Sequence, residues 1–125
     1  MANRFEGRGN LGAAPELKRV TVDGAERDVA ELRIYFDRSV PTEDAGFEDR
    51  GGFWLSASLW GERAEHVASV LTKGARVHVV GTLVRDAWTD RESGEPRERL
   101  ALVLDQVSLD LRRIEAVVTR PAPAR

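Results

Sequence analysis

Two tryptophans stand near the ends of one strand-like segment, FWLSASLWG at residues 53–61. Side chains alternate across a strand, so every second residue shares a face. One face has the apolar character of a core: Phe53, Leu55, Ala57 and Leu59. The other face carries Trp54 and Trp60, with only Ser56 and Ser58 between them. Two large rings around a floor of small side chains form a surface on which other planar groups can stack.

Further aromatic residues fall where they can extend this surface. Six residues at about 3.3 Å each place Trp54 and Trp60 roughly 20 Å apart along the strand. Trp88 follows a bent strand at the edge of a hairpin loop, and Tyr35 is expected on the outer face of a neighbouring strand. Rings spread over a sheet face suit sequence-tolerant stacking on single-stranded bases. The alternative is that Trp54 and Trp60 are buried under a loop or at a subunit interface.

Other chemistry is excluded or disfavoured by composition. The chain has 125 residues and no cysteine, which allows one domain and rules out disulfides and thiolate zinc sites. His66 and His78 do not form a recognisable metal pair, and no carboxylates or glycines fall in a catalytic or phosphate-binding motif. We therefore expect no enzyme, no metal, no cofactor and no small-molecule substrate.

Hydropathy predicts neither a secretory signal nor a membrane span. The N-terminal residues lack an apolar stretch, and the longest wholly apolar run is residues 100–104. We expect a cytoplasmic protein without a membrane partner. The net charge of −2 does not by itself indicate a nucleic-acid partner. Residues 112–125 carry four arginines against Glu115, a net +3, which leaves −5 for residues 1–111.

The pattern of residues predicts mostly strands. Residues 4–12 form a weak first strand, and a short second strand runs through Val20 and Val22 to an Asp23-Gly24 hairpin turn. The next strand, residues 28–40, alternates clearly, with an apolar face formed by Ala30, Leu32, Ile34 and Phe36. A loop rich in glycine and acid is expected over residues 41–52, where residues 43–50 carry a net −3.

One helix is predicted between the strands. Its apolar stripe is Ala64, Val67, Ala68 and Leu71. Lys73 is expected in its last turn, and Gly74 at its end. Strands resume at residues 75–88, where Gly81 predicts a bulge or bend, and at residues 98–111. A helix between the third and fourth strands predicts an all-β, five-stranded Greek-key barrel of the OB-fold type.

The sequence resembles the bacterial single-stranded DNA-binding protein family over about residues 3–111. The longest matching block begins with FWLSASLWG at residue 53, continues through the predicted helix and ends with DAW at residue 88. Shorter matches are GNLGAAPELK, VAELRIYFDR and DQVSLDL. The resemblance implies an OB-fold that binds single-stranded DNA in replication, recombination and repair. It also implies a homotetramer, with a dimer as the second possibility.

The resemblance assigns roles to individual positions. The stacking aromatics of the family fall on Trp54, Trp60 and Trp88, and basic backbone contacts fall on Arg4 and Lys73. Arg33, Arg76 and Arg85 are further candidates for phosphate contacts.

Several positions depart from the family pattern. A further stacking tryptophan of the family falls on Val40, and positions often basic in the family are Ser56, Glu62 and Asp86. The first strand, usually a continuous apolar run, is RFEGRG, which puts the usual assembly in question.

The C-terminal segment also differs. We expect residues 1–111 to form the DNA-binding domain, and residues 112–125 to form a basic, disordered tail in place of the family's usual acidic one. Either the chain is truncated or it is a specialised relative, and a copy from a plasmid or integrating element would fit.

Two functions are compatible with this sequence. The first is a non-enzymatic single-stranded DNA-binding protein. The second is a protein-interaction or assembly module on the same fold, such as an accessory replication or primosome-type protein, whose tryptophans pack on a partner chain. Glu62 and Asp86 favour the second, and the aromatic spacing with its serine floor favours the first.

Overall fold

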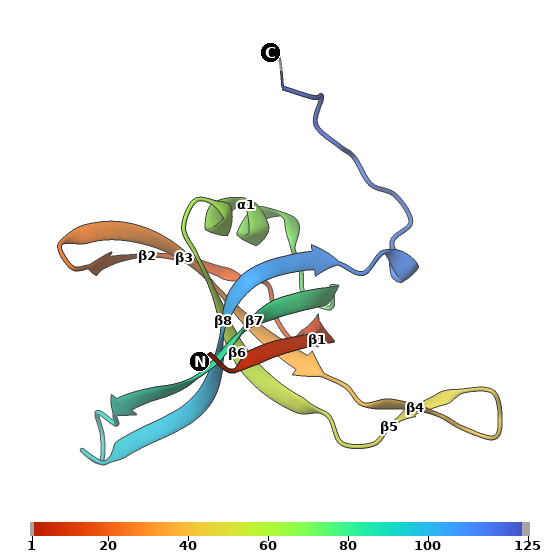
Figure 1. Cartoon of the computed structure of the whole chain (residues 1–125), viewed down its shortest axis with the longest axis horizontal. Coiled ribbons are helices and arrows are strands. Elements are labelled where there is room, and N and C mark those ends of the chain that lie inside the picture. Colours follow the sequence, from red (N-terminus) through yellow and green to blue (C-terminus); the bar gives the residue numbers. More distant parts are fainter. Residues whose placement is uncertain (1, 124–125) are drawn as a thin grey trace.

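The computed structural model describes residues 2–123, and Arg125 of the predicted tail lies outside them. The elements follow one another along the chain as shown in Figure 1: β1 (Arg4–Leu11), β2 (Glu16–Val22), β3 (Ala25–Phe36), β4 (Ser39–Pro41), β5 (Phe47–Asp49), β6 (Phe53–Trp60), α1 (Arg63–Val70), β7 (Arg76–Thr89), β8 (Pro96–Leu109) and the short 3-10 helix η1 (Leu111–Arg113). Residues 114–123 follow η1 without a further helix or strand.

Five strands close into a ring. Hydrogen-bonded neighbours run in the order β1-β7-β8-β6-β3-β2, and β1 also pairs with β3 through Asn10 and Leu11. The ring therefore consists of β1, β7, β8, β6 and β3, and β2 lies outside it, paired with β3. β6 and β8 are parallel, whereas the other neighbours are antiparallel. The helix follows the third strand of the ring, which confirms the predicted five-stranded architecture.

Alternating apolar residues of the ring strands fill its interior. The apolar face predicted for β3 is confirmed, since Ala30, Leu32, Ile34 and Phe36 are all at most 3% exposed. The largest fully buried side chains are Ile34, Leu59, Leu102, Val77 and Val79. Each such side chain contributes about 1.5–3 kcal/mol by leaving water. The ring is therefore held mainly by its inner faces, which leaves the outer faces available for other tasks.

Phe53 departs from the predicted core face of β6. Leu55, Ala57 and Leu59 are buried, but Phe53 is 48% exposed. It lies at the first position of the strand, where its ring stacks on Phe36 at a centroid distance of 5.5 Å and meets Phe5 edge-on at 6.3 Å. Phe53 thus covers the core from one end of the ring and keeps part of its ring in solvent.

The helix is shorter than its apolar stripe predicts. It ends at Val70, and Lys73 lies in the turn that follows rather than in the last helical turn. Leu71 is already extended, and its side chain is only 6% exposed, because it packs into the core. The next residues pair with β1, where the Gly74 N–H donates to the Leu11 carbonyl at 2.8 Å. Another helical turn would break these contacts with the ring.

Two local predictions are confirmed in the hairpins. Asp23 and Gly24 form the turn between β2 and β3, with φ angles of 51° and 79°. The pairing of β7 with β8 shifts register between Val80 and Gly81, which is the predicted bulge. A Cβ at Gly81 would overlap the carbonyl oxygen of Val103 and lie 3.1 Å from Leu104 Cα. Only glycine lets β7 and β8 approach this closely.

Beyond the bulge, β7 and β8 continue as a two-stranded ribbon. Residues 85–89 pair only with residues 96–100 among the described residues, because β1 reaches only to Thr82 and β6 pairs with β8 only at residues 101–103. The ribbon projects from the ring at the lower left of Figure 1.

The predicted loop over residues 41–52 contains a small hairpin of its own. β4 pairs with β5 and extends away from the ring on the right of Figure 1. The base of this hairpin is fixed by Asp49, which accepts hydrogen bonds from the Tyr35 hydroxyl and, at 3.0 Å, from the Arg38 N–H.

Candidate nucleic-acid interface

The outer faces of β3 and β6 bring most of the predicted stacking residues together. Their register sets four pairs side by side: Tyr35 with Trp54, Arg33 with Ser56, Glu31 with Ser58, and Val29 with Trp60. Trp54 and Trp60 are 47% and 39% exposed. The outward orientation predicted for both rings is therefore confirmed.

The same surface continues onto β8 and β7. Ala101 lies opposite both Ser56 and Val84, and Val103 lies opposite Ser58. Two residues further along the ribbon, Asp86 faces Arg99, and then Trp88 faces Arg97. Trp88, 46% exposed, thus shares one continuous outer surface with Trp54 and Trp60. We call this surface the aromatic face: the outward side chains of β3, β6, β8 and β7 from Trp54 and Trp60 to Trp88.

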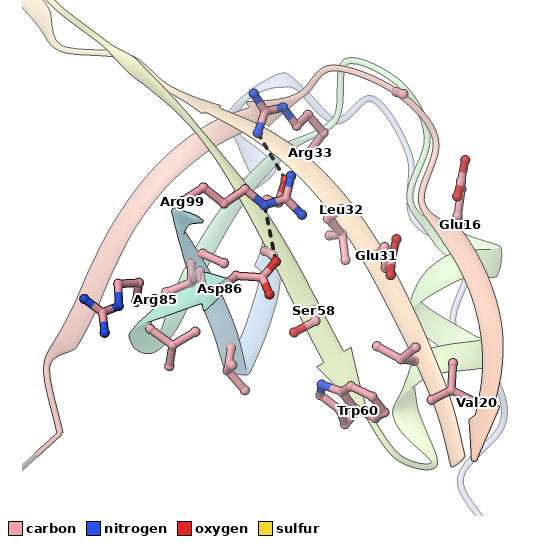
Figure 2. Close-up of a pocket in the computed structure, with 18 of the residues that line it drawn as sticks. Glu16, Val20, Glu31, Leu32, Arg33, Ser58, Trp60, Arg85, Asp86 and Arg99 are labelled. Atoms are coloured by element: carbon pink, nitrogen blue, oxygen red, sulfur yellow. Dashed lines mark hydrogen bonds and ion pairs between the residues drawn. The ribbon is translucent and has the colours of Figure 1, made fainter. Parts of the chain in front are cut away.

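An open groove of about 570 Å³ runs over the aromatic face. Figure 2 shows Trp60 at one end, Arg33 at the other, and Ser58, Asp86 and Arg99 between them. The floor is made of small side chains, Ser56, Ser58 and Ala101. A planar base can lie on such a floor without a steric clash.

Trp54 is held by three neighbours. Its centroid lies 5.2 Å from that of Tyr35, and the Arg33 guanidinium lies over its ring at 5.5 Å. Arg33 is fixed in turn by donating to Ser56 Oγ at 3.1 Å. A Cβ at Gly12 would come within 2.6 Å of the ring, so Gly12 is what allows the indole to lie against the backbone. Trp54 is a pre-oriented platform with part of its ring in solvent.

Tyr35 is kept neutral and in place by an acidic neighbour. Its hydroxyl donates a hydrogen bond to Asp49, which raises the pKa of Tyr35 and lowers that of Asp49. The phenol therefore remains protonated well into alkaline solution. It connects the aromatic face to the base of the β4–β5 hairpin.

Trp60 has a structural task as well as an exposed ring. Its cross-strand partner Val29 belongs to the outer face but is only 2% exposed. Because Trp60 and Val29 line the same groove wall, the indole helps to cover this valine. Trp60 itself stays 39% exposed and is not buried under a loop of the described chain.

Trp88 lies on the ribbon with arginine at its face. The Arg99 guanidinium is 5.3 Å from the centre of its ring, and Arg99 Nε is 3.4 Å from Asp86 Oδ2. Arg97, opposite Trp88, lies 3.5 Å from Asp90. Arg97 and Arg99 are basic residues of the aromatic face that the sequence did not identify. Arg97 and Arg99 are two residues apart, which predicts that they share one face of the strand. The register that places them beside Trp88 depends on the hairpin loop and could not be read from the sequence.

The predicted basic residues do not all reach the aromatic face. Arg33 lies on it, and Arg4 continues the outer surface on β1, opposite Thr82. Arg85 projects from the opposite side of the ribbon and pairs with Glu98 at 3.5 Å, although it borders the groove. Lys73 is exposed in the turn before β7.

Arg76 lies in a polar cluster rather than beside the stacking rings. Its Nη1 donates at 2.7 Å to both Asn10 Oδ1 and Asp37 Oδ1, and its Nε is 3.7 Å from Asp110. The guanidinium keeps the pKa of Asp37 below its usual range through this hydrogen bond. Arg76 thus joins the ends of several strands.

The aromatic face carries charges of both signs. Glu31 pairs with Lys18 at 3.0 Å, and this hydrogen bond raises the pKa of Lys18. Asp86 neutralises Arg99 in the same groove. A phosphate that approached Arg99 would therefore meet a cation that already has an acidic partner.

The described part of the chain contains neither a cluster of potential metal ligands nor a helix that could span a membrane. Residues 2–123 hold no group of three or more histidine, cysteine or acidic side chains placed to bind a metal ion. Within the same residues, no helix has the length and apolar character needed to cross a bilayer. His78 instead contacts Glu6 at 2.8 Å, and His66 lies 3.3 Å from Arg120.

Comparison with known proteins decides between the families that this fold can serve. The sequence matches the Single-strand binding protein family over residues 2–110. The chain belongs to this family. Membership confirms the resemblance found in the sequence, and it supports a single-strand binding protein rather than an enzyme.

Individual relatives agree with the assignment to the single-strand binding family. The Single-stranded DNA-binding protein of Mycobacterium tuberculosis is 35% identical over 130 residues, covering 94% of this chain and 77% of that protein. The protein of the same name from Paenarthrobacter aurescens is 38% identical over 115 residues, covering 90% of this chain and 64% of that protein.

A solved structure confirms the fold. The small single-stranded DNA-binding protein from Streptomyces coelicolor has a TM-score of 0.71 at 15% identity, covering 90% of this chain and 98% of that one. The OB-type barrel predicted from the strand order is thus observed.

Proposed function

We propose that this protein binds single-stranded DNA by stacking bases on Trp54, Trp60 and Trp88, with Tyr35 and Arg33 supporting the first platform. The observation that carries the proposal is the aromatic face itself. Three tryptophans, each 39–47% exposed, share one outer surface, and small side chains form the floor of the groove beside Trp60. Stacking on such rings is tolerant of sequence, because every base has a flat face. The proposed task is to bind and protect single strands during replication, recombination and repair in the cytoplasm.

A second candidate rests on the carboxylates in the groove. Glu31 and Asp86 stand on the aromatic face, and a polyanion is repelled by both. The tryptophans would then pack against a partner protein. We favour DNA because two similar relatives are named for binding it, and because both carboxylates are paired with cations in the free protein.

Titration of the intrinsic tryptophan emission distinguishes these functions. If the rings stack on bases, saturating oligo-dT quenches most of the emission, whereas duplex DNA of equal length quenches little, because its bases are already stacked. An emission spectrum that stays unchanged at saturating oligo-dT would contradict the stacking proposal. That result would favour the second candidate, in which the tryptophans bind a partner protein.

We further propose that the protein works as a homotetramer, with a dimer as the second possibility. The supporting feature is an open strand edge. β1 pairs with β7 along Arg4–Asn10, but it meets β3 only at Asn10 and Leu11, so most of its other edge has no partner strand in the described chain. Such an edge can pair with a second copy. Light scattering at micromolar concentration measures the mass, and a monomer there would exclude both assemblies.

A further inference from the structure

A single ion pair occupies the centre of the groove. Asp86 and Arg99 face each other across β7 and β8, on the side of the ribbon that belongs to the aromatic face. Figure 2 shows the two side chains pointing toward one another, with Arg99 Nε 3.4 Å from Asp86 Oδ2. Both are about half exposed, with side-chain exposures of 50% and 46%. The pair is therefore open to any ligand that enters the groove.

The contacts of Arg99 leave it ready to accept another anion. Within residues 2–123, the hydrogen bonding of its side chain to protein is limited to the Nε contact with Asp86. The guanidinium carbon Cζ lies over the Trp88 ring, 5.3 Å from its centre. A guanidinium binds a phosphate through two parallel N–H donors, which is stronger than one long contact to a carboxylate. Exposed ion pairs are weak, so Asp86 can be displaced.

We propose that Asp86 competes with DNA phosphate for Arg99, so that binding of a single strand exchanges one anion for the other. This inference rests on the proposed function. In the free protein Asp86 holds the arginine over Trp88. In the complex the arginine turns to a phosphate, one face of the Trp88 ring opens to a base, and Asp86 is left without its cation. Asp86 is thus an internal inhibitor of phosphate binding by Arg99.

The exchange affects how binding responds to salt. A phosphate neutralised by an arginine releases condensed cations, which is why affinity falls as salt rises. A carboxylate that loses its arginine takes up cations from solution and offsets part of this release. The wild-type protein should therefore show a weaker salt dependence than a variant without the carboxylate.

The opposite side of the same ribbon offers a matched control. Glu98 pairs with Arg85 at 3.5 Å, one residue out of phase with the Asp86–Arg99 pair and thus on the other side of the ribbon. Asp86→Asn and Glu98→Gln each remove one negative charge from the ribbon and keep a side chain of similar size. They change the long-range field alike, but only Asp86→Asn frees an arginine on the aromatic face.

The experiment compares the wild type, Asp86→Asn and Glu98→Gln by binding of labelled oligo-dT over a range of salt. We expect Asp86→Asn to bind roughly twofold to fivefold more tightly at low salt, the range that one exposed ion pair permits. Its log–log salt slope should be steeper by up to about 0.7, the contribution of one phosphate on a single strand. Glu98→Gln should stay close to the wild type in both quantities. Equal gains from both variants would overturn the proposal.

A second background tests whether Asp86 acts through Arg99. In Arg99→Ala protein, Asp86→Asn can remove only the repulsion between carboxylate and phosphate. Its gain should therefore be smaller than in the wild-type background. The same gain in both backgrounds would show that Asp86 acts on the DNA directly and would refute the exchange.

The same binding data distinguish a failure of the proposed function from a failure of the anion exchange. If the wild type does not bind oligo-dT at all, the proposed function falls and the exchange falls with it. If the wild type binds but Asp86→Asn does not exceed Glu98→Gln, the exchange alone is wrong. Both substitutions lie on an exposed ribbon, so we expect each variant to fold. Thermal melting of each variant checks this.

Discussion

The three tryptophans of the aromatic face have different packing environments. Trp54 leans on Gly12, Tyr35 and Arg33, whereas Trp60 covers a valine that would otherwise meet water. Trp88 stands on a two-stranded ribbon, where its ring meets Arg99. A loss of affinity on substitution can therefore come from the missing stack alone or from a disturbed fold, depending on the residue.

Trp88→Ala should separate binding from stability. We expect it to lose about 1–3 kcal/mol of binding free energy, the worth of one base stack, while the free energy of unfolding changes by less than about 0.5 kcal/mol. Trp60→Ala should lose a similar amount of binding and also about 1 kcal/mol of stability, because Val29 becomes exposed. Polarisation of labelled oligo-dT and urea denaturation measure the two quantities. A Trp88→Ala variant that binds like the wild type would remove Trp88 from the interface.

At the scale of elements, what could be predicted from the sequence was local. The two faces of β6 apart from Phe53, the apolar face of β3, the Asp23-Gly24 turn and the bulge at Gly81 each follow from a pattern within a few residues. Alternation is visible in the sequence because one face of each strand must be buried. The outward tryptophans were found for the same reason.

The features that were missed depend on contacts between distant segments. The helix stops at Val70 because Leu71 enters the core and Gly74 pairs with β1, sixty-three residues away at Leu11. Arg99 joins Trp88 only through the register of β7 with β8, which the loop between them does not reveal. The charge pairing of the groove was thus invisible before the strands were aligned.

Gly81→Ala tests the bulge that redirects β7 and β8. The new methyl would overlap the Val103 carbonyl oxygen, and backbone cannot move aside as a flexible side chain can. We expect the free energy of unfolding to fall by about 1–3 kcal/mol, as for other overpacked sites. Gly46→Ala is the control, because its Cβ would meet only Thr42 Oγ1 at an ordinary 3.5 Å. Similar urea midpoints for both variants would mean that the bulge tolerates a side chain.

At the scale of the whole molecule, one polar cluster ties the ring together. Arg76 on β7 bonds Asn10 on β1 and Asp37 just after β3, and it approaches Asp110 just after β8. Asp110 is held more strongly by Arg112, which keeps the pKa of its carboxyl far below the usual range. Four strands therefore meet at a site whose acids are charged in the folded protein.

This cluster predicts how stability responds to acid. The pKa of Asp37 is lowered by Arg76, so its contribution is fully present above the unfolded value of about 3.9 and is lost as the pH falls through the folded value. Stability should be nearly constant from pH 7 to pH 5 and decline below about pH 4. Asp37→Asn should be less stable at pH 7 but lose less between pH 7 and pH 3. Urea denaturation at both pH values measures this, and equal acid losses would exclude Asp37 as a source.

The placement of Trp88 outside the ring has a consequence for the lifetime of a complex. Trp54 and Trp60 stand on β6, which pairs with both β3 and β8. The ribbon from Arg85 onward is held by one strand pair, and such ribbons open first. A bound DNA strand would dissociate from the ribbon first, while its other bases remain stacked on the tryptophans of β6. A second protein molecule could then bind the released DNA segment before the first molecule dissociates. The rate of dissociation would then rise with the concentration of free protein. DNA would be transferred directly from one protein molecule to another without an unbound intermediate.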